Sequence, residues 1–376
     1  MREFASILLL LSLLSTCAFL YVGNIPTVEA LPELHQGDMI LSGNNVTVIE
    51  GSFDINGSII VTENATLILN NAVVNFVQTS GWQRNITLEN PLNGYPRLQS
   101  INTTVTSGFT YSAYLLSGSS TAVADSQFVG SSGAYCWFVI SGTAHFENLT
   151  AHGMSISDGD AFLSNSSITD LNVYSGSLHA NSSNIHSSNT YGTGVTSMDK
   201  CTLSVVYVTE ESQQYVSDST TTDLVTYYKA AAWLVNSTYT GQTAYNESAV
   251  FEFWYLAVHV VDNISQDIPS ANVTARYPNS TVAESKLTDI NGMAKLTLMQ
   301  RKINATGSFP IGDYTIQATH EIFANNTLVD MTENQEITIT LPFIIPELTS
   351  SLVLQIFMVA TILAVIAHKR RRVAPR

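Results

Sequence analysis

The sequence predicts an all-β protein, in which a coiled solenoid is followed by a small β-sandwich. Short polar segments recur at a nearly constant spacing in the first half of the chain, and strictly alternating strand patterns follow in the second half. Alternation of apolar and polar residues is typical of strands, and a repeat of about twenty residues is typical of a solenoid. Long apolar segments at both ends add an N-terminal signal peptide and a C-terminal transmembrane helix to this prediction.

The N-terminal segment, residues 1–30, has the organisation of a secretory signal peptide. Arg2 supplies positive charge, Ile7–Leu14 forms an apolar core, and Val28-Glu29-Ala30 fits a small-residue cleavage site. These three parts in this order are the signature of export. Two alternatives remain open, namely an uncleaved N-terminal anchor and a lipoprotein attached through Cys17.

The C-terminal segment predicts a membrane anchor over residues 344–368. Leu348–Ala367 is almost entirely apolar, and the basic residues Lys369 to Arg372 follow it directly. About twenty apolar residues can cross a bilayer as one helix, and a basic cluster after such a run stays in the cytoplasm. We therefore expect a basic cytoplasmic tail over 369–376 and a single-pass membrane protein whose bulk is extracellular.

Composition limits the function of the extracellular part. The net charge is −15, only 12% of residues are charged, and no Lys or Arg occurs from Leu98 to Asp199. Such a surface repels phosphate backbones, so nucleic-acid binding is not expected. After removal of the signal peptide, Cys136 and Cys201 remain. An oxidising exterior permits a disulfide between them, but two buried free thiols are the favoured interpretation.

Glycosylation motifs are more frequent than chance predicts. The chain contains fifteen Asn-x-Ser/Thr sequons, where about six would arise by accident in a chain this rich in Asn, Ser and Thr. Occupied sequons lie on the surface of exported proteins. The candidate glycosylation sites are Asn45, Asn56, Asn64, Asn85, Asn102, Asn148, Asn165, Asn181, Asn236, Asn246, Asn263, Asn272, Asn279, Asn304 and Asn325.

A six-residue motif fills the predicted solenoid, which we place over residues 31–208. Each copy has an apolar residue, a short polar step and a second apolar residue. The copies begin at Leu69, Ala124, Phe146, Leu163, Ala180 and Met198, and the last five are 22, 17, 17 and 18 residues apart. The small polar residues suit a tight bend between strands. The pattern resembles the right-handed parallel β-helix, and a β-sandwich with similar strands is the alternative.

A junction over 209–250 precedes a predicted sandwich over 251–343. Its segments resemble the carboxypeptidase regulatory-like domain, an Ig-like or prealbumin-like module. Thr288, Asp289 and Gly292 match the turn of that family, and Gly312 and Tyr314 match its Gly-x-Tyr strand. The Gly that usually precedes the family's Pro is replaced by Gln266 or Asp267. The resemblance implies a non-catalytic, stalk-like module.

Candidate chemistry in the solenoid is sparse. Asp158 and Asp160 form the one closely spaced carboxylate pair. A solvated turn is the favoured interpretation, and a Ca²⁺ site or a catalytic pair is a weak alternative. With 17 residues per coil, His145 and His179 fall in one column with Phe162 between them. His152 and His186 would share a second column, too widely spaced for one metal ion. We therefore predict no catalytic residue, no metal site and no cofactor.

The aromatic run of Phe251, Phe253, Trp254 and Tyr255 fits either a sugar-stacking platform or a buried first strand of the sandwich, and the strand is favoured.

The tail also resembles the sorting signals of archaeal surface proteins, with Leu348 where an aromatic residue is usual after Pro346-Glu347. Together, these features resemble an archaeal cell-surface glycoprotein. The expected role is structural or adhesive, with polysaccharide or neighbouring surface proteins as partners. The alternative is a carbohydrate-active enzyme, a lyase or hydrolase, on the same scaffold.

Overall fold

The structure is a computed structural model that describes residues 34–90, 94–131, 133–342 and 357–365. The predicted signal peptide and basic tail lie outside these residues, as does most of the predicted anchor. A helix covers 357–365, and among the described residues no helix has the length and apolar character needed to cross a membrane. The chain divides into two compact units. The first contains the residues up to Glu252 together with Lys302–Phe309, and the second contains Phe253–Arg301 and the residues from Pro310 onward.

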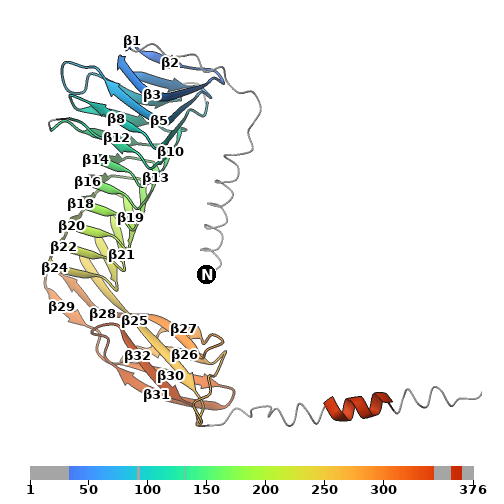
Figure 1. Ribbon diagram of the computed structural model, residues 1–376. Coiled ribbons are helices and arrows are strands. Elements are labelled where there is room, and N and C mark those ends of the chain that lie inside the picture. Colours follow the sequence, from blue (N-terminus) through green and yellow to red (C-terminus); the bar gives the residue numbers. More distant parts are fainter. Residues whose placement is uncertain (1–33, 91–93, 132, 343–356, 366–376) are drawn as a thin grey trace, which may run out of the picture. The chain divides into compact units, whose positions relative to one another are not determined.

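The first unit is a parallel β-helix, as predicted, in which each coil lies on the one before it (Figure 1). The first ladder of parallel strands consists of β3 (Val46–Asn56), β5 (Thr66–Phe76), β7 (Arg97–Ile101), β10 (Ser120–Ala124), β13 (Thr143–Glu147), β15 (Asp160–Ser164), β17 (Ser177–Asn181), β19 (Val195–Asp199), β21 (Gln213–Ser217), β23 (Ala231–Val235) and β25 (Ala249–Val261).

Two further ladders complete the early coils. The second contains β1 (Leu34–Gln36), the later parts of β3 and β5, β8 (Thr104–Ser107) and β11 (Gln127–Phe128). The third contains β2 (Met39–Leu41), β4 (Ile59–Thr62), β6 (Asn85–Glu89), β9 (Tyr111–Leu115) and β12 (Cys136–Ile140).

The second and third ladders merge at β14 (Thr150–Ile156), which pairs with both β11 and β12. The merged ladder continues through β16 (Ser167–Val173), β18 (Asn184–Thr190), β20 (Thr202–Val208), β22 (Thr220–Thr226) and β24 (Thr238–Ala244). The merger coincides with the shortening of the repeat to 17 or 18 residues, because no loop then separates the two strands of a coil.

Alternation within each short strand places the core inside the coil. In β15, Ala161 and Leu163 are buried while Phe162 points outward, and the same pattern recurs in β13 and β17. Parallel register stacks each inward residue on its equivalent in the next coil, as Phe146 stacks on Leu163. The buried residues form one continuous apolar cluster from Met39 to Val250.

The predicted tight bends are confirmed at the polar step of the motif. Asn102, Asp125, Asn148 and Asn165 all have φ between 48° and 50°. This left-handed conformation is tolerated by Asn and Asp because their short polar side chains bond locally.

The solenoid extends further than the predicted boundary at Val208. Strands β21 to β24 continue both ladders in unbroken parallel register, and they occupy most of the predicted junction. The Ser- and Thr-rich composition of residues 209–226 is typical of a linker. Here those side chains alternate, so that every second one faces outward while Val216 and Leu224 fill the interior.

The second unit has the predicted sandwich character. Its antiparallel sheet has the order β27 (Val282–Leu287), β26 (Asn272–Arg276), β30 (Tyr314–His320) and β31 (Phe323–Val329). The later half of β25 pairs in parallel with β32 (Gln335–Thr340), and β28 (Met293–Asn304) and β29 (Gly307–Pro310) are the remaining strands. A separate apolar cluster that includes Val258, Val273, Leu296 and Ile316 forms its core.

Residues of the predicted Thr-Asp-x-x-Gly turn hold one corner of this unit. The buried Thr288 hydroxyl donates to the Ile268 carbonyl and accepts from the Ala271 N–H. Asp289 accepts hydrogen bonds from the N–H groups of Asn291 and Met293. Gly292 has a φ of +68°, and a Cβ there would lie 2.6 Å from the Val260 carbonyl oxygen. The turn therefore requires glycine at this position.

Candidate functional site

Asp158 and Asp160 lie in the turn before β15 and at its first residue. Both side chains are exposed, and Asp158 has a φ of 126°. The hydroxyl of Ser175 donates to Asp158, and the hydroxyl of Ser177 donates to Asp160. Each carboxylate thus bonds to the coil that follows it. Within the described residues no group of three or more His, Cys, Asp or Glu side chains is arranged to hold a metal ion.

The predicted histidine columns agree with the strand register. His145, Phe162 and His179 occupy equivalent positions in consecutive coils, and their rings stack with centroids 4.6 and 5.3 Å apart. His152 and His186 lie at the bend of β14 and of β18. His152 is 3.3 Å from Asp170, and His186 bonds to Ser204.

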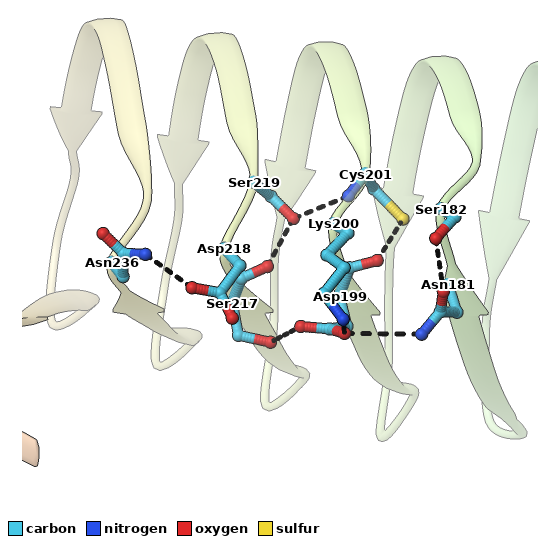
Figure 2. A network of polar contacts seen from close by, with 9 residues as sticks. All are labelled: Asn181, Ser182, Asp199, Lys200, Cys201, Ser217, Asp218, Ser219 and Asn236. Atoms are coloured by element: carbon cyan, nitrogen blue, oxygen red, sulfur yellow. Dashed lines mark hydrogen bonds and ion pairs between the residues drawn. The ribbon is translucent and has the colours of Figure 1, made fainter. Parts of the chain in front are cut away.

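A row of polar side chains follows the left-handed corners of the solenoid, and we call it the corner row. Side-chain amides in this row bond to the carboxylate or amide of a neighbouring coil, as Asn148 does to Asp125 at 2.6 Å and Asn102 to Asn71 at 2.7 Å. Figure 2 shows the equivalent contact between Asn236 and Asp218. The members from the fourth coil onward are Asn102, Asp125, Asn148, Asn165, Ser182, Lys200, Asp218 and Asn236.

The residue after each corner belongs to a buried hydroxyl row. Ser166, Ser183, Ser219 and Ser237 each donate to the carbonyl oxygen two residues earlier. The same oxygen accepts the N–H of the preceding coil, as Ser166 does from Leu149 at 2.9 Å. Figure 2 shows this geometry at Ser219 and Cys201, where the thiol replaces the hydroxyl. Both rows stabilise the coil and leave no free nucleophile.

Both remaining cysteines are buried free thiols, which agrees with the favoured interpretation. Burial raises the pKa of the Cys136 thiol well above its ordinary value, with a smaller opposing effect from the Tyr111 hydroxyl. Burial likewise raises the pKa of Cys201. Because thiolates are the reactive form, neither side chain is suited to nucleophilic chemistry.

None of the fifteen sequon asparagines is buried, so all are compatible with modification. Four of them are half-buried, namely Asn56, Asn85, Asn236 and Asn304. Asn102, Asn148, Asn165 and Asn236 lie in the corner row, where they also take part in or adjoin the side-chain contacts between coils.

The most concentrated group of aromatic side chains lies on the outer face of the third ladder, around Trp137. Trp137 of β12 pairs with Gly153 of β14, and a Cβ on Gly153 would lie 2.0 Å from ring atom Cε3 of Trp137. The indole therefore lies flat over the glycine backbone, and its Nε1 donates to the Ser155 hydroxyl at 2.8 Å. The opposite face of the ring points away from the coil.

Three more rings surround Trp137 and complete what we call the aromatic cluster. Tyr135 stacks on His152 with centroids 4.3 Å apart, and Trp82 meets Tyr135 edge-on at 5.9 Å. Trp82 is 54% exposed and has a φ of 63°. For a bulky side chain this backbone conformation is strained, and such strain is concentrated at binding sites.

The loop that carries Trp82 is held by local hydrogen bonds. Gln78 donates to the carbonyl groups of Phe109 and Thr110, and Gln83 accepts from the backbone N–H of Thr79. The Trp82 N–H donates to the Thr110 carbonyl at 2.6 Å. Trp82 is thus presented on a fixed backbone.

The aromatic cluster was not predicted from the sequence, because its members come from separate segments. One signal was available, since Gly153 interrupts a strand pattern and glycine in a strand often marks close approach of another group. The predicted aromatic run at Phe251–Tyr255 is instead distributed along β25. Phe251 stacks on Trp233, Trp254 packs against the sandwich core and donates to Gln300, and Lys295 covers Tyr255 at 3.2 Å.

This arrangement is suited to binding an uncharged, hydroxyl-rich ring. Broad aromatic faces pack against the C–H groups of a pyranose, while nearby polar groups bond its hydroxyls. Ser155, His152 and Asp170 provide those polar groups beside the indole. Asp170 is the carboxylate paired with the cluster, whereas glycoside hydrolysis requires two facing carboxyl groups.

Comparison with known proteins gives no assignment. No protein-family model matches the chain, and no curated protein matches it. One solved structure with a local likeness is the Bacillus anthracis TIE protein, which is 14% identical over 28% of this chain, with a TM-score of 0.20. The match covers 18% of that protein's chain, so the fold and the site are argued here from strand register and side-chain contacts.

Proposed function

We propose that this chain is a glycan-binding, structural or adhesive glycoprotein of the cell surface. In this proposal the signal peptide exports it, the C-terminal segment anchors it in the membrane, and the sandwich serves as a stalk-like module. The sequence features that resemble archaeal surface glycoproteins support this placement, together with fifteen unburied sequons. The observation that carries the binding role is the flat Trp137 indole on Gly153 beside the exposed Trp82.

Charge favours neutral glycans as the ligand class. The coils from Leu98 to Asp199 contain six acidic residues and no basic residue other than histidine. Such a surface attracts neither nucleic acids nor polyuronates, because like charges raise the cost of association. The alternative function, a carbohydrate-active enzyme, is supported by the same scaffold and by the carboxylates Asp158 and Asp160.

A glycan array with the full-length chain in detergent tests the proposal. We expect binding to neutral oligosaccharides, with an affinity at least tenfold lower in Trp82→Ala, because loss of a central aromatic contact in a binding site typically costs at least about 1.4 kcal/mol. Trp137→Phe, which keeps a flat ring, should lose less. Tyr228→Ala removes an equally exposed ring elsewhere (58%) and should bind like the wild type.

Two results would contradict this proposal. Equal binding by Trp82→Ala and Tyr228→Ala would exclude the aromatic cluster as the site. Release of reducing sugar from a bound glycan, abolished by Asp158→Asn or Asp160→Asn, would establish the enzyme alternative instead.

A further inference from the structure

A column of stacked rings follows the outer face of the first ladder, and we call it the outer column. Each member lies at the middle of a strand, and the stacked neighbours are 4.6 to 5.6 Å apart with interplanar angles of 7° to 16°. The rings are His145, Phe162 and His179 on one side, and Tyr215, Trp233 and Phe251 on the other.

One coil interrupts this column. Strand register places Ser197 between His179 and Tyr215, at the position where the other coils carry a ring. Because neighbouring strands are about 4.8 Å apart, the facing sides of the His179 and Tyr215 rings are separated by about 9.6 Å. No ring contact spans this interval among the residues that the structure describes.

A second column of tyrosines is interrupted in the same coil. Tyr174 stacks on Tyr191 at 5.2 Å, and Tyr227 stacks on Tyr245 at 4.7 Å. Thr209 holds the intervening position, because its N–H bonds to the preceding coil in the same way as those of Tyr191 and Tyr227. The coil that contains β19 and β20 therefore differs from its neighbours at two separate columns.

Polar groups border the break at Ser197. Asp199 lies two residues further along β19, hence on the same face of the strand. Its carboxylate accepts from the Ser217 hydroxyl at 2.7 Å and the Asn181 amide at 3.3 Å, and Lys200 lies 3.5 Å away (Figure 2). These contacts fix the carboxylate and leave lone pairs that can accept further hydrogen bonds. Tyr215 is itself held by a bond from its hydroxyl to Gln213 at 2.9 Å.

We propose that this break binds one pyranose ring of a neutral glycan, inserted edge-on between His179 and Tyr215 with its hydroxyls bonded to Asp199. A ring in the empty position would lie about 4.8 Å from each neighbour, the spacing at which the column already stacks. The polar border favours a hydroxyl-bearing ring over an aromatic side chain of a partner, and the acidic surface disfavours an anionic sugar. This inference rests on the proposed function but assigns a site separate from the aromatic cluster.

The test uses the full-length chain in detergent, with ¹³C-labelled histidine and tyrosine, titrated with cellohexaose, chitohexaose and maltohexaose. We expect at least one of these sugars to shift the ring resonances of His179 and Tyr215. Ser197→Tyr, which supplies the missing ring, should weaken this binding at least tenfold while leaving thermal unfolding at or above the wild-type temperature. Thr222→Tyr adds the same ring at an exposed position of the other ladder and should keep the wild-type shifts.

The inference and the proposed function fail separately. Shifts at Tyr135 and His152 without shifts at His179, up to about 10 mM sugar, would overturn this site and leave the aromatic cluster intact. Shifts at His179 that persist in Ser197→Tyr would also overturn it. Shifts at neither place with any of the three sugars would contradict both.

Discussion

His145 shows how a single outward residue can link pH to stability. Its ring begins the outer column, where Phe162 covers one face in an almost parallel stack. Burial lowers the pKa of His145 below its ordinary value of about 6.5. The unfolded chain therefore takes up this proton more readily than the folded chain. The resulting stabilisation is complete above about pH 6.5 and is lost as the pH falls through that value towards the lower, folded-state pKa.

We expect His145→Phe to reduce the pH dependence of unfolding, because phenylalanine keeps the stack on Phe162 and does not titrate. The urea midpoints of wild type and variant, compared at pH 7 and pH 5, measure this difference. Wild type should lose more stability between the two pH values than the variant does. An NMR titration should give a His145 pKa below 6.5, and equal losses in both proteins would contradict the assignment.

At the scale of the element, the hydroxyl row explains why Ser follows the corner in so many coils. The Ser166 hydroxyl is buried, donates to the Ser164 carbonyl at 2.7 Å and accepts the Leu149 N–H at 2.9 Å. It therefore satisfies two backbone groups that the sharp corner removes from the ladders. An unpaired buried polar group costs about 1–3 kcal/mol.

Ser166→Ala should lower the free energy of unfolding by about 1–3 kcal/mol, since it leaves the Leu149 N–H without its acceptor. Ser167→Ala, one residue further and exposed, should change it by less than about 0.5 kcal/mol. Chemical denaturation followed by circular dichroism measures both values. Similar losses in the two variants would show that the hydroxyl row does not stabilise the coil.

The sequence predicted the coil because its signal is local. Six residues around each bend, such as Ala180 to Ile185, contain both strand ends and the corner, and spacing alone then fixes the stacking of His145 over Phe162. The end of the solenoid was placed too early, because the polar composition of residues 209–226 obscures the inward positions of Val216 and Leu224. The aromatic cluster depends on Trp82, Tyr135 and His152, which only the folded register brings together.

At the scale of the whole molecule, the chain path joins the two units more closely than a simple linker would. The chain leaves the solenoid after Glu252, returns to that unit for Lys302–Phe309, and then leaves again. Within the first unit, Ile303 packs against the apolar core, and Lys302 lies 5.5 Å from the ring centre of Phe251. Solenoids need terminal caps, because their last coil would otherwise expose its interior to water.

We therefore expect the segment Lys302–Phe309 to act as the cap of the solenoid, and Ile303→Ser to loosen its final coils. Loss of one partly buried apolar contact should cost about 1–2 kcal/mol. Hydrogen exchange should accelerate first in β23 and in the first residues of β25, with little change in β13 and β15, because each coil contacts only its neighbours. Ile322→Ser, at a position 90% exposed, is the matched control and should exchange like the wild type. Unchanged protection of β23 in Ile303→Ser would mean that the last coil is stabilised without this segment.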